Sequence, residues 1–306
     1  MSAVPPPRPL DHLVLAARDL EAQAAFYRRL GFTVGARNRH PWGTENHVVQ
    51  LEGGFLELIS TGPAFMRPAE VDPHVYSFPQ FIADYLAQRE GLAMLALASA
   101  DARADAAQFR ALGIGDYEPF HFERRGKAAD GRDVHVAFTL AYARSRLIEA
   151  AGFFTCQQHN PDNFWSPAFQ RHANGARRLK SAVMIADGPS DHAEFLSHFT
   201  RQREMLATSM GLEIDVGGGG RVEVLTPVAF QFHFGAQALA AAGQGALGFE
   251  TAATQTRFAA FRIAVADLAA AEALLAGAGL RHERRDGQIV VAAADAFGVA
   301  LSFEPA

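Results

Sequence analysis

The stretch LDHLVLAARDLEAQAAFYRRLGFTV at residues 10–34 decides the fold. It opens with an apolar run typical of a strand and reaches Asp19, whose carboxylate can accept hydrogen bonds from the free N–H groups of a first helical turn. The next apolar residues share one face of a helix that stops at Gly31: Leu20, Ala24, Tyr27 and Leu30. Residues 10–34 therefore predict a strand followed directly by an amphipathic helix.

The same unit recurs along the chain. Its strand and terminal Asp appear as HLVLAARD at 12–19, MLALASAD at 94–101, KSAVMIAD at 180–187 and AFRIAVAD at 260–267. A helical pattern and then short alternating runs bounded by Gly follow each copy, which indicates a repeated β-α-β-β-β unit. One unit has too few strands to close a core, so we expect the units to pair.

Pairing divides the chain into two domains, which its length of 306 residues also favours. Modules 10–61 and 90–160 form an N-terminal domain at 10–172. Modules 178–234 and 257–304 form a degenerate C-terminal domain at 176–305. The predicted class is α+β, with four βαβββ modules. Long loops are expected at 61–89 and 160–178.

Composition excludes several classes of function. Hydrophobic residues make up 49% of the chain, charged residues 20%, and the net charge is −5, which is typical of a soluble globular protein. No basic surface for nucleic acid and no apolar run long enough for a membrane span is expected. Cys156 is the only cysteine, so no internal disulfide can form. We expect a cytoplasmic protein whose partner is a small molecule, with a homodimer left open.

The repeats single out two residues of the first module. At the position of His12 the later copies carry Met94, Lys180 and Ala260. Glu57 follows Gly54 by three residues, and the corresponding residues of the later copies are Thr155, Glu223 and Leu301. Only the first module therefore combines an imidazole with a carboxylate, a pair able to bind a divalent metal. Lys180 and Glu223 are expected to form an ion pair, and the C-terminal domain is interpreted as structural or regulatory.

The opening stretch, GGFLELIS at 53–60 and RHPWGTENHVVQLEGGFLELI at 39–59 resemble the vicinal oxygen chelate superfamily, especially its glyoxalase-like branch. The resemblance implies the glyoxalase/bleomycin-resistance/dioxygenase-like fold, in which paired modules form two cup-shaped, incompletely closed barrels. It also implies a divalent metal bound by residues of the first and last strands, here His12 and Glu57. Four-module relatives include extradiol dioxygenases, whose iron lies in the C-terminal pair. Without matching ligands there, this chain departs from them.

A third metal ligand is sought in GFFTCQQHNPDNFW at 152–165. If Thr155 faces inward, strand alternation also turns Gln157 and His159 inward and Cys156 outward. Gln157 would then contact substrate and His159 would reach the metal. The alternative is that His159 is a polar residue at the end of a strand.

Two further segments are expected to bind substrate. The loop RNRHPWGTENH at 37–47 offers Arg39, His40, Trp42 and Asn46 to an anionic or carbonyl group. Phe122 lies on an aromatic strand face with Arg124 and could line an apolar cavity. The alternatives are a solvated loop and ordinary core packing. The 24 Phe against 5 Tyr favour an apolar or aromatic ligand with one anionic end.

Three functions remain open. The first is a metal-dependent lyase or isomerase using Zn, Ni, Mn or Fe, with Glu57 as ligand or base and His12 as ligand. The second is a non-catalytic protein that sequesters a small molecule in the same cup. The third is an iron-dependent oxygenase using His12, His159 and Glu57.

Overall fold

The Asp residues that end the repeated strands cap helices, as the sequence predicts. The structure is a computed structural model that describes residues 6–67, 72–127, 133–236 and 255–306. Side-chain oxygens of Asp19, Asp101 and Asp267 accept hydrogen bonds from N–H groups in the first turn of the next helix. The third repeat differs, because its helical segment begins with a 3-10 turn after Gly188.

The first half of the chain forms two βαβββ modules. The first contains β1 (Leu10–Ala16), α1 (Leu20–Arg29), β2 (Asn38–Arg39), β3 (Thr44–Leu51) and β4 (Gly54–Thr61). After α2 (Phe78–Gln88), the second contains β5 (Gly91–Ala98), α3 (Ala102–Ala111), β6 (Phe120–Lys127), β7 (Asp133–Ala143) and β8 (Gly152–Gln158). The short helix α4 (Pro161–Phe164) follows.

The second half repeats this order. The third module contains β9 (Ala176–Ile185), η1 (Pro189–His192), α5 (Ala193–Thr200), β10 (Leu206–Thr208), β11 (Gly211–Val216) and β12 (Gly220–Leu225). After α6 (Pro227–Phe234), the fourth contains β13 (Arg257–Val265), α8 (Leu268–Gly277), β14 (Glu283–Arg285), β15 (Gln288–Val291) and β16 (Ala300–Pro305).

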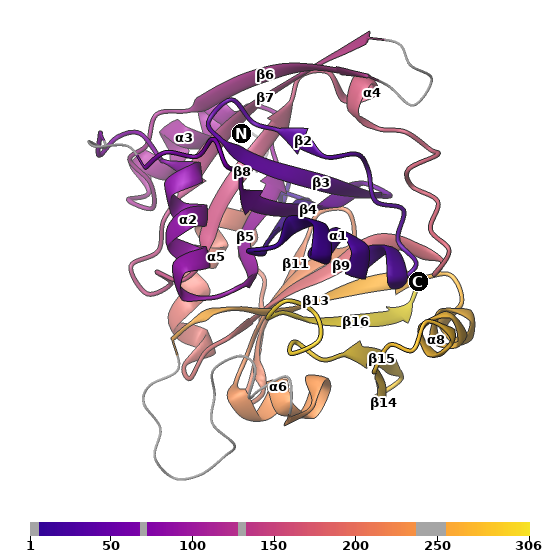
Figure 1. Cartoon of the computed structure of the whole chain (residues 1–306). Helices are drawn as coiled ribbons and strands as arrows, with labels where there is room; N and C mark the ends of the chain where they lie inside the picture. The colour runs from indigo at the N-terminus through magenta and orange to yellow at the C-terminus, as the bar shows by residue number, and fades with distance from the viewer. Residues whose placement is uncertain (1–5, 68–71, 128–132, 237–254) are drawn as a thin grey trace.

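Each pair of modules shares one eight-stranded sheet. The orders are β2-β3-β4-β1-β5-β8-β7-β6 and β10-β11-β12-β9-β13-β16-β15-β14. In the middle of each sheet the first strands of two modules pair antiparallel, β1 with β5 and β9 with β13. The first sheet curls into a half-open cup (Figure 1). The predicted α+β class, with paired modules in two cup-shaped, incompletely closed barrels, is confirmed.

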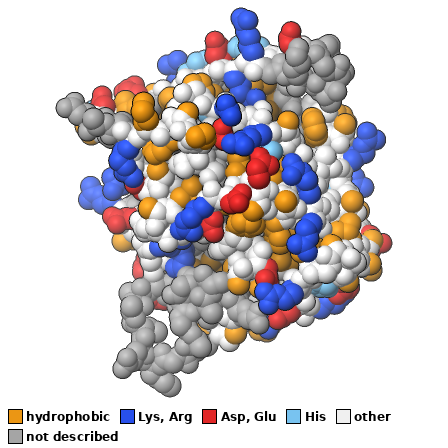
Figure 2. Space-filling view, in the orientation of Figure 1, with side chains coloured by type: hydrophobic (Ala, Val, Ile, Leu, Met, Phe, Trp, Pro, Cys, Tyr) orange, Lys and Arg blue, Asp and Glu red, His pale blue; other side chains and the backbone are white. Residues whose placement is uncertain are grey.

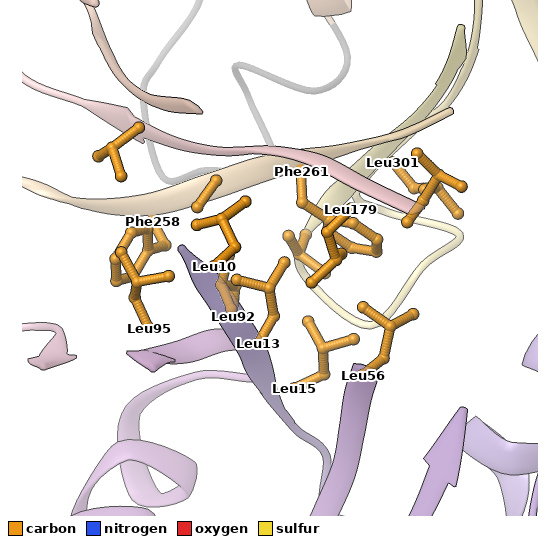
Figure 3. Packing of buried hydrophobic residues seen from close by; sticks show 14 of the residues in the cluster. Leu10, Leu13, Leu15, Leu56, Leu92, Leu95, Leu179, Phe258, Phe261 and Leu301 are labelled. Atoms are coloured by element: carbon orange, nitrogen blue, oxygen red, sulfur yellow. The ribbon is translucent and has the colours of Figure 1, made fainter. Parts of the chain in front are cut away.

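The convex faces of the two sheets pack against each other in one core. Leu13 and Leu15 of β1 point into it, where side chains of β9 and β13 such as Leu179 and Phe261 meet them (Figure 3). Residues of α1, α3, α5 and α8 belong to the same core. Because side chains alternate along a strand, the residues between these leucines face the concave side of the cup.

One helix enters each cup between its two modules. α2 packs Phe78, Ile82, Tyr85 and Leu86 against the concave face of the first sheet, and α6 packs Phe230 and Phe234 against that of the second. The expectation of a loop throughout 61–89 is therefore wrong for residues 78–88. The apolar spacing of FPQFIADYLAQ is helical, and its Pro suits a first turn, where no N–H donor is needed.

The visible surface carries charges of both signs. Lys and Arg side chains are interspersed with Asp and Glu over the face in Figure 2. That face offers no continuous basic surface for nucleic acid. No helix of the described residues has the length and apolar character needed to cross a bilayer.

A buried charged cluster connects the two halves of the chain. Asp105 of α3 accepts hydrogen bonds from Nη2 of Arg8 at 2.7 Å and Nη2 of Arg201 at 2.6 Å. Arg8 also donates to the carbonyl oxygen of Phe199 at the end of α5. Burial alone would raise the pKa of Asp105, but the hydrogen bond and charge of Arg8 lower it below the ordinary value.

Asp105→Asn should lower the free energy of unfolding by about 3 kcal/mol, because it leaves Arg8 buried beside a neutral group. The control Asp101→Asn replaces an exposed carboxylate and keeps a capping side chain, so it should change stability by less than about 0.5 kcal/mol. Urea denaturation measures both.

The same cluster should make stability pH-dependent. Since the folded pKa of Asp105 lies below its unfolded value of about 3.9, ionised Asp105 stabilises the fold above that pH. The contribution is lost as the pH falls through the folded pKa. Wild type should therefore lose more stability than Asp105→Asn on acidification below about pH 4, and equal losses would contradict this role.

Candidate functional site

A cavity opens on the concave face of the first sheet. Its free volume is about 50 Å³, so it is narrow. Aromatic side chains form most of its wall: Trp42, Phe55, Phe78, Phe122, Phe138, Phe154 and Phe164. A smaller set of polar side chains lies among them: His12, His40, Asn46, Glu57, Arg124 and Cys156. An apolar cavity with a few converging polar groups is the usual form of a small-molecule site.

His12 is fixed by its neighbour in the chain. The pairing of β1 with β5 shifts register between Leu10 and His12, so Asp11 occupies a bulge. The Asp11 carboxylate lies 2.5 Å from Nδ1 of His12 and also accepts from Gln158 at 2.9 Å. A carboxylate can only accept hydrogen bonds, so Nδ1 donates to Asp11 and Nε2 is the ring nitrogen that approaches Glu57. Phe55 stacks on the ring at 4.2 Å.

Glu57 lies between two imidazoles. β4 runs parallel to β1 and places Glu57 opposite Val14, two residues beyond His12. Its Oε2 is 3.9 Å from Nε2 of His12, and its Oε1 is 3.8 Å from Nε2 of His40. Asn46 donates to Oε1 at 2.5 Å and so orients the carboxylate.

His40 is a neutral imidazole at pH 7. Burial lowers its pKa below the ordinary value, although the charge of Glu57 acts in the opposite direction. Its ring stacks on Trp42 at 4.7 Å, and Nδ1 lies 2.8 Å from the Thr44 hydroxyl. The sequence presents His40 as a substrate-binding residue, and the structure places its Nε2 on the cavity side, 3.8 Å from Oε1 of Glu57.

Arg124 extends from β6 into the cavity. Its Nη1 donates to Asn38 at 2.9 Å, and it forms no ion pair with the described carboxylates. Burial lowers its pKa, while Glu57 raises it. A guanidinium has five donors, so several of those of Arg124 remain available to an anionic ligand.

Three of the residues predicted for the site lie outside the cavity. Arg39 is 75% exposed and pairs with Glu45 at the surface. Gln157 bonds the backbone at the start of α3, to Ala102 N–H and Ala100 carbonyl. His159 lies on the opposite face of β8. It shares the Thr139 hydroxyl with His121.

The error on β8 is a shift of one residue. In the first module His12 pairs with Phe55, one residue after Gly54, whereas Met94 pairs with Gly152 itself. Counting from the glycine therefore reverses inside and outside on β8. Phe154 and Cys156 face the cavity, and Gln157 and His159 face away. The expectation that Cys156 points away from Glu57 is wrong.

Because of that shift, the sequence predicts Cys156 on the outward face, whereas the structure places it in the cavity wall. Ligand atoms of Asp11, His12 and Cys156 lie within 4.8 Å of one another. Burial raises the pKa of the thiol well above its ordinary value, and the charges of Asp11 and Glu57 raise it further. Cys156 is therefore a protonated thiol at neutral pH.

The second cup has different chemistry. The expected ion pair of Lys180 with Glu223 is wrong, since Lys180 pairs with Glu304 at 2.7 Å and Glu223 pairs with Arg262 at 2.9 Å. The register explains this. Glu223 lies opposite Val183, two residues beyond Ser181, so Ser181 rather than Lys180 corresponds to His12.

Comparison with known proteins agrees with this architecture. The family described as glyoxalase-like domain matches residues 10–200. A hypothetical protein from Staphylococcus aureus has a TM-score of 0.63 at 10% identity, covering 97% of this chain and 99% of that chain. A mutant of 4-hydroxymandelate synthase from Streptomyces coelicolor has a TM-score of 0.57 at 15% identity, covering 98% of this chain and 92% of that chain. A search of curated proteins finds no match.

A fusion of a xylose isomerase-like TIM barrel with 4-hydroxyphenylpyruvate dioxygenase has a TM-score of 0.53 at 12% identity, covering 98% of this chain and 49% of that chain. At these identities the structures show the fold alone. The fold is one of paired βαβββ modules, with an aromatic-lined cavity in the first cup. The chain belongs to the glyoxalase-like family of the vicinal oxygen chelate superfamily.

The placement of Cys156 can be checked chemically. Because its thiol is buried and protonated, we expect Ellman's reagent to label the folded chain at least about tenfold more slowly than the urea-unfolded chain. The single cysteine makes the absorbance change unambiguous. Equal rates in the two states would contradict the placement.

Proposed function

We propose that the N-terminal cavity is the active site of a metal-dependent lyase or isomerase that acts on a small oxygenated substrate. The observation that supports this most is the approach of His12 Nε2 to Glu57 at 3.9 Å inside an aromatic cavity, with Asp11 holding the other ring nitrogen. A carboxylate behind a histidine is the usual support of a metal-binding imidazole.

The donor set suits a borderline divalent metal such as Zn, Ni, Mn or Fe. His12 and Glu57 would hold it. His40 rather than His159 would supply the third ligand, and its ring would have to move toward His12, because the ligand atoms of these three residues do not all lie within 4.8 Å of one another. His40 is neutral, so its lone pair is available. The metal, when bound, would act as a Lewis acid on the substrate oxygens.

The other side chains bind and orient the substrate. The aromatic wall would contact its apolar part and exclude water, and Arg124 would bind an anionic end. Asn46 keeps the Glu57 carboxylate turned toward the cavity. Glu57 would be a ligand or the base that moves a proton. The substrate class is therefore an apolar or aromatic molecule with neighbouring oxygens and an anionic group.

Metal analysis tests the proposal directly. We expect about one equivalent of Zn, Ni, Mn or Fe per chain after reconstitution, and we expect His12→Ala to lose it because the set falls below three protein ligands. The control is His121→Ala, which removes an exposed imidazole on the opposite face of the sheet. Elemental analysis of the dialysed proteins gives the result.

The identity of the metal separates the functions. Iron as the bound metal would favour an oxygenase over an isomerase. No metal, even after reconstitution, would contradict the enzyme proposal. The narrow aromatic cavity would then favour a non-catalytic protein, in which His12 and Glu57 recognise a polar group of the sequestered ligand.

Arg124 gives a second test, with benzoate as the probe. Arg124→Gln should weaken benzoate binding about tenfold, because a charge-assisted hydrogen bond to the carboxylate is lost. Arg125→Gln is the matched control: the neighbouring residue is exposed and alternates to the other face of β6. Isothermal titration calorimetry measures both. An equal loss in both variants would show that the effect is long-range electrostatics rather than contact.

A further inference from the structure

The second cup contains a cavity of its own. It lies on the concave face of the C-terminal sheet and has a free volume of about 430 Å³. It is thus roomier than the first cavity, and among the described residues of its wall the only aromatic ring is the imidazole of His233. An apolar or planar ligand would find no matching surface there.

The floor of this cavity is a charged network. Arg262 donates to both oxygens of Glu223, at 2.9 and 3.1 Å, and to Gln288 and Glu304 at 2.7 and 2.8 Å. The face of its guanidinium lies over Phe234 at 4.7 Å. Burying such a network often stabilises a fold less than apolar packing of similar volume would, so stability alone does not account for it.

One polar group of the floor has no partner. Ser181 lines the cavity and is 1% exposed, yet its hydroxyl makes no hydrogen bond within the described residues. A buried hydroxyl without a partner costs stability. A ligand in the cavity would provide that partner. Ser181 also occupies the position that corresponds to His12 in the first cup.

The charges around the cavity favour a cation. Five carboxylates of the described residues line it: Glu213, Asp215, Glu223, Asp286 and Glu304. The described lining also contains three permanently charged cations, Lys180, Arg221 and Arg262, so carboxylates outnumber cations. Burial lowers the pKa of His233, so its ring is neutral near pH 7 and leaves the excess of negative charge unchanged.

A metal cation fits this wall poorly. Most of the carboxylates already accept from Arg or Lys side chains. Among the described residues, no three His, Cys, Asp or Glu ligand atoms of this cup lie within 4.8 Å of one another. An ammonium group needs only two or three acceptors in hydrogen-bond geometry, and spaced carboxylates and a hydroxyl provide them.

We infer that the C-terminal cup is a second binding site, which takes a small primary amine and receives its ammonium group between the Ser181 hydroxyl and the surrounding carboxylates. The site is independent of the metal chemistry proposed for the first cup. It gives the degenerate module pair a binding role in place of a purely structural one.

Calorimetric titration of the full chain with 1,4-diaminobutane tests this inference, with Mg²⁺ and benzoate as comparison probes. We expect saturable binding of the diamine at one per chain. Ser181→Ala should weaken it about tenfold, because a hydrogen bond to a charged group is lost. The matched control is Ser302→Ala, which removes a hydroxyl that is equally buried and unpartnered but does not line the cavity. It should leave binding unchanged.

Folding is not at risk in either variant, since each removes a buried hydroxyl that has no partner. Thermal denaturation without ligand should therefore show Tm values at or above that of wild type. The inference is overturned by the absence of saturable diamine binding at millimolar concentration, by Mg²⁺ binding in its place, or by equal affinities in Ser181→Ala and wild type. Diamine binding that persists in metal-free His12→Ala separates this site from the first.

Discussion

The two-sided burial of β1 is the constraint on which the site depends. Leu13 and Leu15 must enter the core between the two sheets, where nothing polar could be accommodated without cost (Figure 3). The pleat then leaves His12, Val14 and Ala16 facing the cup. A shift of one residue would expose the leucines and bury the imidazole in the core, so the packing of the two halves fixes the direction of His12.

The bulge at Asp11 brings the carboxylate to the same face as His12, which regular strand alternation would not do. In a regular strand Asp11 would point to the face opposite His12, into the core. The register shift between β1 and β5 removes it from the ladder and turns its carboxylate to the Nδ1 atom of His12. Bulges commonly redirect side chains beside functional sites, and this one leaves Nε2 as the free nitrogen of the ring.

The repeated unit, its helix-capping Asp residues and the class of fold could be predicted from the sequence. Each depends on local patterns that recur in every module. The sequence also brought together His12, Glu57, His40, Trp42, Asn46 and Phe122, which line one cavity. It failed where the register between strands mattered. The glycines that begin β4 and β8 pair differently, so a count from the glycine places Gln157 and His159 on the cavity face and Cys156 on the opposite face, the reverse of the structure. The register between strands that are distant in the sequence is a property of the tertiary structure, so it cannot be derived by counting residues along one strand.

The two cups share one topology and differ in chemistry because the fold constrains their convex faces far more than their concave ones. On the convex side every inward residue must fill the common core, and apolar side chains are required in both halves. On the concave side the cup is open, so polar residues can contact solvent or ligand. The position of His12 in one cup therefore holds Ser181 in the other, and an aromatic wall is replaced by a charged one. The second cup lacks the imidazole that His12 provides in the first. This difference does not imply that the second cup has no site, because the same scaffold can present a different set of donors.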